Sequence, residues 1–136
     1  MQIDILVYVH TERCLWRRPF VPPSTGLRLA ALTPVCHQVC VIHPPIESVR
    51  PATKADLVCL LFSRLFVKQA YQLAAQLAVQ GKLVVMGGSF VTRHPEEALE
   101  VCEAVLIGAI EPRWLRLLMD ANAGQLQRYY KKEAVH

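Results

Sequence analysis

The residues best suited to bind a ligand follow an apolar run in the middle of the chain, in the segment VVMGGSFVT. Gly87 and Gly88 allow a ligand to approach the backbone closely, and Ser89 and Thr92 add hydroxyl groups beside exposed amides. A glycine pair is also typical of a tight turn between a strand and a helix, so both interpretations stay open. No GxGxxG follows the first apolar run and no GxxxxGK[ST] occurs in the sequence, which argues against dinucleotide and P-loop nucleotide sites.

A second group of candidates lies after the first apolar run, in VHTERCLWRRPFVPP. His10 directly follows that run, where a histidine can bind a metal or simply make a structural hydrogen bond. Trp16 and Phe20 could cover a planar ligand, but an aromatic side chain folded back on the core explains them equally well. Arg13, Arg17 and Arg18 could contact a phosphate or a partner's carboxylate, but they are equally well explained as solvated surface residues.

The five cysteines do not follow a metal or disulfide pattern. Cys36 and Cys40 begin a CxxxCxxC whose third position holds His43, so we expect no iron–sulfur cluster. With a spacing of four on or beside a strand, these two thiols lie too far apart to bridge. We expect Cys59 and Cys102 to pack in the core of a protein from a reducing cytoplasm.

Length and composition indicate a single folded domain over residues 1–136, with 53% hydrophobic and 19% charged residues. The longest apolar runs, such as Leu57 to Phe62, are too short to cross a bilayer, and no basic stretch precedes the first one. We therefore expect no membrane segment and no secretory signal. The net charge is +4, but apart from Arg17-Arg18 and Lys131-Lys132 the basic residues are scattered, which does not favour nucleic-acid binding.

Short β-type runs alternate with segments of helical periodicity, a pattern that predicts an α/β domain with a parallel sheet. The expected strands are Ile3 to Val9, Gln38 to Ile42, Leu57 to Phe62, Leu83 to Met86 and Ala104 to Ile107. The expected helices are Thr25 to Leu32, Arg64 to Gln80, one that begins at Pro95, and one from Pro112 to about Asn122. The apolar positions are Phe66, Ala70, Leu73, Ala74 and Leu77 in the second of these helices, and Leu115, Leu118 and Met119 in the last.

The connection from Pro44 to Asp56 carries no helical pattern and is long enough to pass one strand. This favours a flavodoxin-like, Rossmann-like three-layer sandwich with a five-stranded parallel sheet in the order 2-1-3-4-5. Ligands of open α/β sheets bind at the carboxyl ends of the strands where the chain reverses direction. The loops to consider therefore begin at His10, Ser63, Gly87 and Gly108.

Several segments, taken in order, resemble the cobalamin-binding domain at the N-terminus of cobalamin-dependent radical S-adenosylmethionine enzymes. They are PPSTGLRLAALTP, KADLVCLLF, GKLVVMGGSFVTRHPEEALE and CEAVLIGAIE with PRWLRLLMDANAGQLQRYY, and they cover roughly residue 20 to the end. The run GG…T…PEEAL…AxxxG is the most specific part. The resemblance implies that the strand-end loops bind the corrin ring of cobalamin (vitamin B12) and that its nucleotide tail enters the carboxyl edge of the sheet.

The resemblance also implies which residues contact the cofactor. Ser63-Arg64-Leu65 and Gly87-Gly88 match the Ser-x-Leu and Gly-Gly signatures of the wider cobalamin-binding fold. His10 aligns with the histidine of its DxHxxG motif and becomes the candidate axial ligand of cobalt, although the acid and the glycine of that motif are missing. The full set of expected cofactor contacts is His10, Ser63, Leu65, Gly87, Gly88, Ser89, Thr92 and Gly108.

Two further positions depart from the family, which usually has a histidine where Phe90 stands and an acid where Ala109 stands. The radical S-adenosylmethionine barrel with its three-cysteine cluster is also absent, so we expect that the chain cannot itself generate a radical.

The expected function is a free-standing corrinoid-binding module that carries, delivers or senses cobalamin. The resemblance implies a role as accessory subunit of a cobalamin-dependent methyltransferase or radical S-adenosylmethionine enzyme, with the exposed corrin face covered by a partner protein or a second copy. The alternative is a scaffold or interaction domain that kept the fold and lost the cofactor, with the ring of Phe90 filling the slot for the tail. A complete enzyme is not favoured, because no nucleophile–base pair and no paired carboxylates occur in a plausible cleft.

Overall fold

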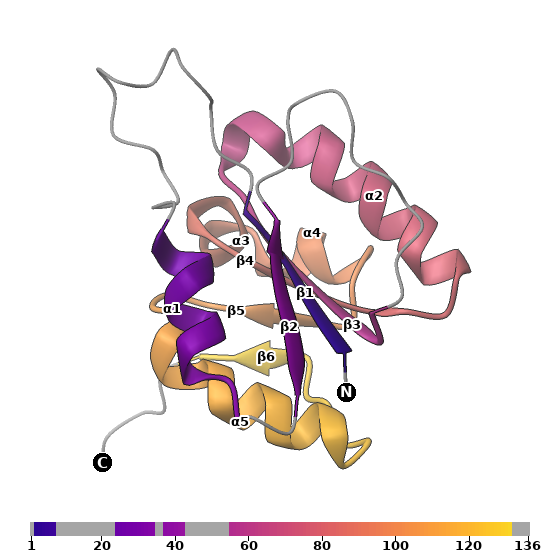
Figure 1. Ribbon diagram of the computed structural model, residues 1–136. Helices are drawn as coiled ribbons and strands as arrows, with labels where there is room; N and C mark the ends of the chain where they lie inside the picture. Colours follow the sequence, from indigo (N-terminus) through magenta and orange to yellow (C-terminus); the bar gives the residue numbers. More distant parts are fainter. Residues whose placement is uncertain (1, 8–23, 35–36, 43–54, 132–136) are drawn as a thin grey trace.

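The computed structural model describes residues 2–7, 24–34, 37–42 and 55–131 of the chain. Its centre is a sheet of six parallel strands in the order β2-β1-β3-β4-β5-β6 (Figure 1). The strands are β1 (Gln2–Val7), β2 (Gln38–Ile42), β3 (Leu57–Leu61), β4 (Leu83–Gly87), β5 (Ala104–Leu106) and β6 (Tyr129–Tyr130).

Helices cover both faces of this sheet. The helices are α1 (Ser24–Leu32), α2 (Val67–Val79), α3 (Ser89–Arg93), α4 (Pro95–Leu99) and α5 (Glu111–Asn122), and a short 3₁₀ helix, η2 (Arg64–Phe66), precedes α2. Buried residues of α1 and α5 pack on one face of the sheet, and those of α2, α3 and α4 pack on the other. The structure therefore has the three layers expected of a Rossmann-like α/β fold. None of the helices in the described ranges is long and apolar enough to cross a membrane.

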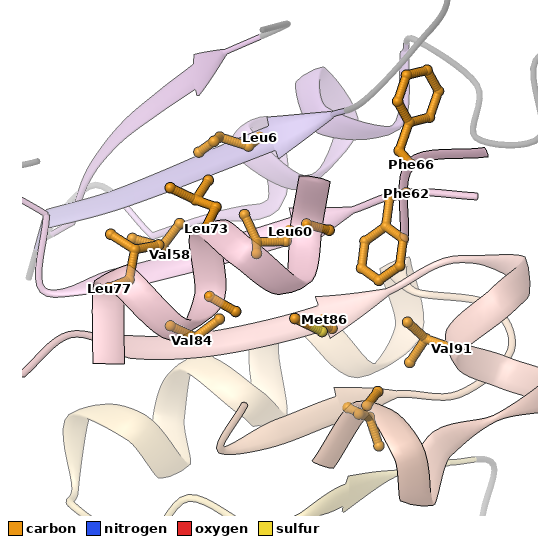
Figure 2. Close-up of a cluster of buried hydrophobic side chains, with 14 of the residues drawn as sticks. Leu6, Val58, Leu60, Phe62, Phe66, Leu73, Leu77, Val84, Met86 and Val91 are labelled. Carbon is orange, nitrogen blue, oxygen red and sulfur yellow. The ribbon is translucent and has the colours of Figure 1, made fainter. Parts of the chain in front are cut away.

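The central strands are apolar on both sides because both of their faces are covered. In β3, Leu57, Cys59 and Leu61 pack toward α1 and α5, whereas Val58 and Leu60 pack toward α2, and all five are buried. Figure 2 shows the α2 side of the core, where Leu60 and Met86 of the strands lie among side chains that include Leu73 and Val91 of the helices.

Helix α2 confirms the face predicted from its periodicity. Its inward residues, together with the last residue of η2, are Phe66, Ala70, Leu73, Ala74 and Leu77, and all are buried. The predicted single helix from Arg64 to Gln80 begins instead as η2, in which the amide of Phe66 donates to the carbonyl of Ser63 at 3.0 Å.

Helix α5 contains Pro112 in its first turn, as predicted, but the predicted apolar face is partly wrong. Leu118 is buried, whereas Leu115 is 42% exposed and Met119 is 69% exposed. The residues that cover the sheet are Trp114, Leu117 and Leu118. Their spacing of three and four residues defines one helical face, and Leu115 and Met119 lie beside that face rather than on it.

Helices α1 and α5 are joined by hydrogen bonds through Thr33, the residue that follows α1. The indole Nε1 of Trp114 donates to Thr33 Oγ1 at 2.9 Å, and that hydroxyl donates to the carbonyl of Leu29 at 2.7 Å. Arg28 and Glu111 form an ion pair at 3.7 Å between the same helices. These contacts satisfy the buried indole and fix the two helices on their face of the sheet.

The predicted strand order holds for β1 to β5, but the predicted strand count of five is wrong, because a sixth strand, β6, pairs with β5. The amide of Val105 donates to the carbonyl of Arg128 at 2.9 Å, and the amide of Ile107 donates to that of Tyr130 at 2.8 Å. Tyr130 is 5% exposed, and its hydroxyl donates to Asp120 Oδ2 at 2.8 Å. This anchor holds a two-residue strand whose sequence carries no strand pattern.

Candidate functional site

Because all strands are parallel, the loops that follow β3, β4 and β5 emerge at the same edge of the sheet. This carboxyl edge is where the sequence predicts the ligand site. The segments that follow β1 and β2 lie outside the described residues, and they contain His10, Trp16, Phe20, Arg13, Arg17 and Arg18. The candidate axial ligand and the aromatic and basic candidates therefore stay predictions.

Gly88 occupies the first position after β4, and its backbone has φ = 123° and ψ = −179°. This region is open essentially to glycine alone. A Cβ atom placed on Gly88 would lie 2.2 Å from the carbonyl oxygen of Phe62. The loops after β3 and β4 are thus in direct backbone contact, so this glycine is required by the packing of the protein itself.

Gly87 is the last residue of β4 and is also in close contact with its surroundings. A Cβ atom there would lie 3.1 Å from Ile110 Cδ1 and 3.1 Å from Leu61 Cδ2, both at the ends of flexible side chains. The carbonyl of Gly87 accepts a hydrogen bond from the amide of Phe62 at 3.2 Å. The glycine pair therefore fits β4 tightly against β3.

Thr92 connects the loop after β4 to the loop after β5. Its Oγ1 donates to the carbonyl of Gly88 at 2.9 Å, and the amide of Gly108 donates to Thr92 Oγ1 at 3.0 Å. The amide of Thr92 also donates to the Gly88 carbonyl, at 3.0 Å. These bonds link the two loops through one side chain.

Gly108, which follows β5, is the open part of the edge. It is exposed and has φ = 79°, and, its two chain neighbours aside, no heavy atom of the described residues lies within 4 Å of a Cβ placed on it. The following residue, Ala109, is also exposed, and the guanidinium of Arg113 donates to its carbonyl. A ligand that lies over this edge can approach the backbone at Gly108 without meeting a side chain at that position.

The other predicted contacts divide into buried and accessible residues. Ser63 is 3% exposed and makes no side-chain hydrogen bond to cap η2 within the described part of the chain. Leu65 is 48% exposed, and Ser89 is exposed as well. The structure thus brings Gly87, Gly88 and Thr92 together as a floor and leaves Leu65, Ser89 and Gly108 accessible.

An aromatic cluster that the sequence did not indicate lies beside this floor, on the α2 face. The ring centroids of Phe90 lie 6.4 Å from those of both Phe62 and Tyr71, and Phe62 and Tyr71 are 6.1 Å apart in an edge-to-face arrangement. Phe90 also contacts the ring of His94, with centroids 4.7 Å apart. Phe90 is therefore a packed member of this cluster and only half-buried.

Tyr71 is the one member of the aromatic cluster with a buried polar group. Its hydroxyl is buried and has no hydrogen-bond partner in the described part of the chain. Burial, and to a smaller extent the negative charge of Glu97, raises the pKa of Tyr71 to about 12. The hydroxyl therefore stays protonated at neutral pH.

The two cysteines whose side chains are described behave as packing residues. Cys59 is fully buried, as predicted, and burial raises the pKa of its thiol. Cys102 is only half-buried, and its pKa is raised to about 12, mainly by burial. Within the described ranges, no three His, Cys, Asp or Glu side chains come together as metal ligands.

Comparisons with known proteins give two distant relatives, both from Chlorobaculum tepidum. The chain is 28% identical to a bacteriochlorophyllide d C-8(2)-methyltransferase over 119 residues, which is 86% of this chain and 26% of the relative. It is 34% identical to a bacteriochlorophyllide d C-12(1)-methyltransferase over 76 residues, which is 56% of this chain and 17% of the relative. The chain thus spans about a quarter or less of the length of the curated relatives it matches.

No family model matches the chain. No solved structure matches it either.

Proposed function

We propose that this chain is a corrinoid-binding module that holds cobalamin against the carboxyl edge of its sheet and presents it to a methyltransferase. The observation that carries the proposal is the arrangement of the three strand-end loops. The loops after β3 and β4 pack directly against each other, and the loop after β5, which is bonded to Thr92, leaves Gly108 exposed to solvent. The similarity to two methyltransferases, each much longer than the matched region, supports a role within a methyltransferase system.

The described residues fit a large, flat ligand with amide groups around its rim. Gly108 has no side chain to obstruct an approaching ring, and the exposed hydroxyl of Ser89 can donate to or accept from a rim amide. The exposed side chain of Leu65 supplies apolar contact on the same edge. These three residues would hold the ligand, while Gly87, Gly88 and Thr92 would shape the surface beneath it.

Cobalamin, when bound, would supply a cobalt atom able to carry a methyl group. The protein's own contribution in this proposal is to bind and orient the corrin ring and to leave its other face free for a partner. His10 is proposed as the axial ligand of cobalt.

The decisive experiment is a visible-absorption titration of the purified chain with hydroxocobalamin and with methylcobalamin. We expect saturable binding, weakened at least tenfold in Gly108→Asn, a loss of about 1.4 kcal/mol. Asparagine tolerates the positive φ of 79° at this position but would place a side chain in the open space. The matched control is Gly81→Asn, because Gly81 has φ = 76° and equally open space but lies at the other end of β4.

The outcomes separate the parts of the proposal. Absence of binding to the unaltered chain would overturn it, and equal affinity of Gly108→Asn and Gly81→Asn would overturn the position of the site. His10→Ala tests the axial ligand, since loss of that ligand changes the visible spectrum of the bound corrinoid.

One observation favours a second function, a scaffold or interaction domain without cofactor. Phe90 is packed against Phe62 and Tyr71, so an aromatic side chain already occupies space beside the floor. In that case the unaltered chain should bind no corrinoid, and Phe90→His, which introduces the residue usual in the family, tests whether the ring of Phe90 is what closes the site. Acquisition of binding by this variant alone would indicate a cofactor site lost through Phe90.

A further inference from the structure

The hydroxyl of Thr92 has its hydrogen-bonding capacity largely occupied within the protein. A threonine hydroxyl has one proton to donate and two lone pairs to accept with. The proton goes to the Gly88 carbonyl at 2.9 Å, and one lone pair accepts the amide of Gly108 at 3.0 Å. A ligand could therefore use this hydroxyl only as an acceptor, through its remaining lone pair.

The carbonyl of Gly88 is occupied in the same way. It accepts hydrogen bonds from both the amide and the hydroxyl of Thr92, at 3.0 Å and 2.9 Å. The backbone of Gly88 packs closely against the Phe62 carbonyl, whose oxygen would lie only 2.2 Å from a Cβ placed on Gly88. The anchor to which Thr92 is attached is thus fixed in position.

Gly108 stands at the other end of the connection and is the more easily moved partner. It is exposed, has no side chain, and meets no described heavy atom within 4 Å of a Cβ position. A backbone of this kind gains little order from packing. The hydrogen bond from its amide to Thr92 supplies order that packing does not.

We infer that Thr92 is a positioning residue that fastens the loop after β5 to the fixed loop after β4, so that Gly108 is held in place before a ligand arrives. The part of this inference that concerns affinity rests on the proposed function. A ligand that meets an ordered surface loses less conformational entropy on binding, which strengthens binding without any contact to Thr92. The role differs from the direct cofactor contact that the family resemblance implies for this residue.

The test that needs no ligand is amide hydrogen exchange at Gly108, followed by NMR. Thr92→Val keeps the shape of the side chain and removes the hydroxyl, so we expect exchange at Gly108 to become about tenfold faster. Thr92→Ser retains the hydroxyl and should restore the slow rate. The matched control is Thr33→Val, which removes another bridging hydroxyl, one that bonds Leu29 and Trp114 rather than Gly108, and should leave exchange at Gly108 unchanged. Unaltered exchange at Gly108 in Thr92→Val would overturn the inference.

The unaltered chain provides a second test should Thr92→Val fail to fold. An exposed glycine amide without a partner exchanges at the rate of an unstructured peptide, whereas the bond to Thr92 requires clear protection. Lack of protection at Gly108 would overturn the inference without any variant.

Corrinoid titration then tests the effect on affinity. We expect Thr92→Val to bind about tenfold more weakly and Thr92→Ser to bind as the unaltered chain does. Equal affinity of Thr92→Val and the unaltered chain would overturn the positioning role. Absence of binding to the unaltered chain would instead overturn the proposed function, and the exchange experiment would still decide whether Thr92 fastens the loop.

Discussion

The loops after β4 and β5 leave neighbouring strands at the same edge, and each contains a glycine with positive φ, yet their surroundings are opposite. Gly88 lies against the Phe62 carbonyl, and Phe90, two residues later, packs among aromatic rings. Gly108 faces open space, and Ala109 beside it is exposed. The first loop packs against the core, and the second lies at the surface.

This difference teaches that glycine can be required at a strand end for two distinct physical reasons. At Gly88 the protein's own backbone excludes a side chain, so the residue carries no information about a ligand. At Gly108 only the backbone angle requires glycine, and the space above it is available. The position of a ligand is therefore better inferred from the second loop than from the more conspicuous glycine pair.

The largest expected effect comes from Gly88→Ala. The substitution combines a backbone region essentially closed to alanine with a contact of 2.2 Å to a backbone oxygen. We expect a loss of about 3–5 kcal/mol in the free energy of unfolding, measured by urea denaturation. Gly87→Ala is the control, and it should cost only about 1 kcal/mol because flexible side-chain ends can yield. Equal losses in the free energy of unfolding for the two variants would contradict the conclusion that only Gly88 is packed against rigid backbone.

Truncation of Phe90 tests whether the loop after β4 belongs to the core. Phe90→Ala removes contacts with the rings of Phe62 and Tyr71, and since Phe90 is half-buried we expect a loss of about 2 kcal/mol in the same measurement. Ala109→Ser, the corresponding change in the exposed loop, should alter stability by less than about 0.5 kcal/mol. A neutral Phe90→Ala would show that the first loop is as independent of the core as the second.

A smaller effect is expected for Gly108→Ala. Only the cost of a positive φ applies there, about 1 kcal/mol, because no described atom obstructs the new methyl group. Gly108→Asn should cost less than Gly108→Ala, since asparagine adopts this backbone region more readily. Thermal unfolding of the two variants measures the difference, and a cost as large as that of Gly88→Ala would mean that the loop is not open.

The smallest effect concerns Tyr71, whose pKa of about 12 in the folded chain exceeds its ordinary value of 10.0. Above pH 10 the tyrosine of the unfolded chain ionises first, so the unaltered protein should lose stability relative to Tyr71→Phe as the pH rises from 10 to 12. Partial exposure keeps this difference within about 1 kcal/mol. At neutral pH, Tyr71→Phe should be no less stable than the unaltered chain, because the hydroxyl it removes has no described partner.

Tyr130→Phe is the matched comparison for Tyr71→Phe. The Tyr130 hydroxyl donates to Asp120 at 2.8 Å and accepts from the amide of Gln127 at 3.0 Å, so its removal should destabilise the chain by about 1 kcal/mol at neutral pH. Parallel urea titrations at pH 7 and pH 11 check both variants. A larger loss of stability in Tyr71→Phe than in Tyr130→Phe would contradict the conclusion that only the Tyr130 hydroxyl makes stabilising hydrogen bonds.

Much of the fold was predictable because β3 and β4 are continuous apolar runs and α2 has one clear apolar face. Strand β6 was not, since Tyr129–Tyr130 is only two residues long and its anchor, the bond from the Tyr130 hydroxyl to Asp120 of α5, is a tertiary contact that no strand pattern signals. Helix α3 was also missed, because five residues beside a glycine pair carry too little periodicity.

The sequence predicted the edge of the sheet at which the candidate site lies, but not the hydrogen bonds between its loops. The strand order placed Ser63, Gly87 and Gly108 at the same end of the sheet. The bond between Thr92 and Gly108 joins residues 16 apart and depends on how two loops meet. The spacing of four between Gly88 and Thr92 was the available signal, since a threonine hydroxyl in a helical turn can bond the carbonyl four residues earlier.

The contact between Trp114 and Thr33 has a consequence for how the chain acquires its structure during synthesis. The two residues are 81 positions apart. Leu29 of α1, whose carbonyl accepts from Thr33, is fully buried in the core cluster to which α5 contributes. Until the ribosome has released the residues of α5, this leucine has no cover on that side and the chain cannot reach its folded state. A nascent chain that stalls before Glu111 would therefore expose apolar surface and become a substrate for chaperones.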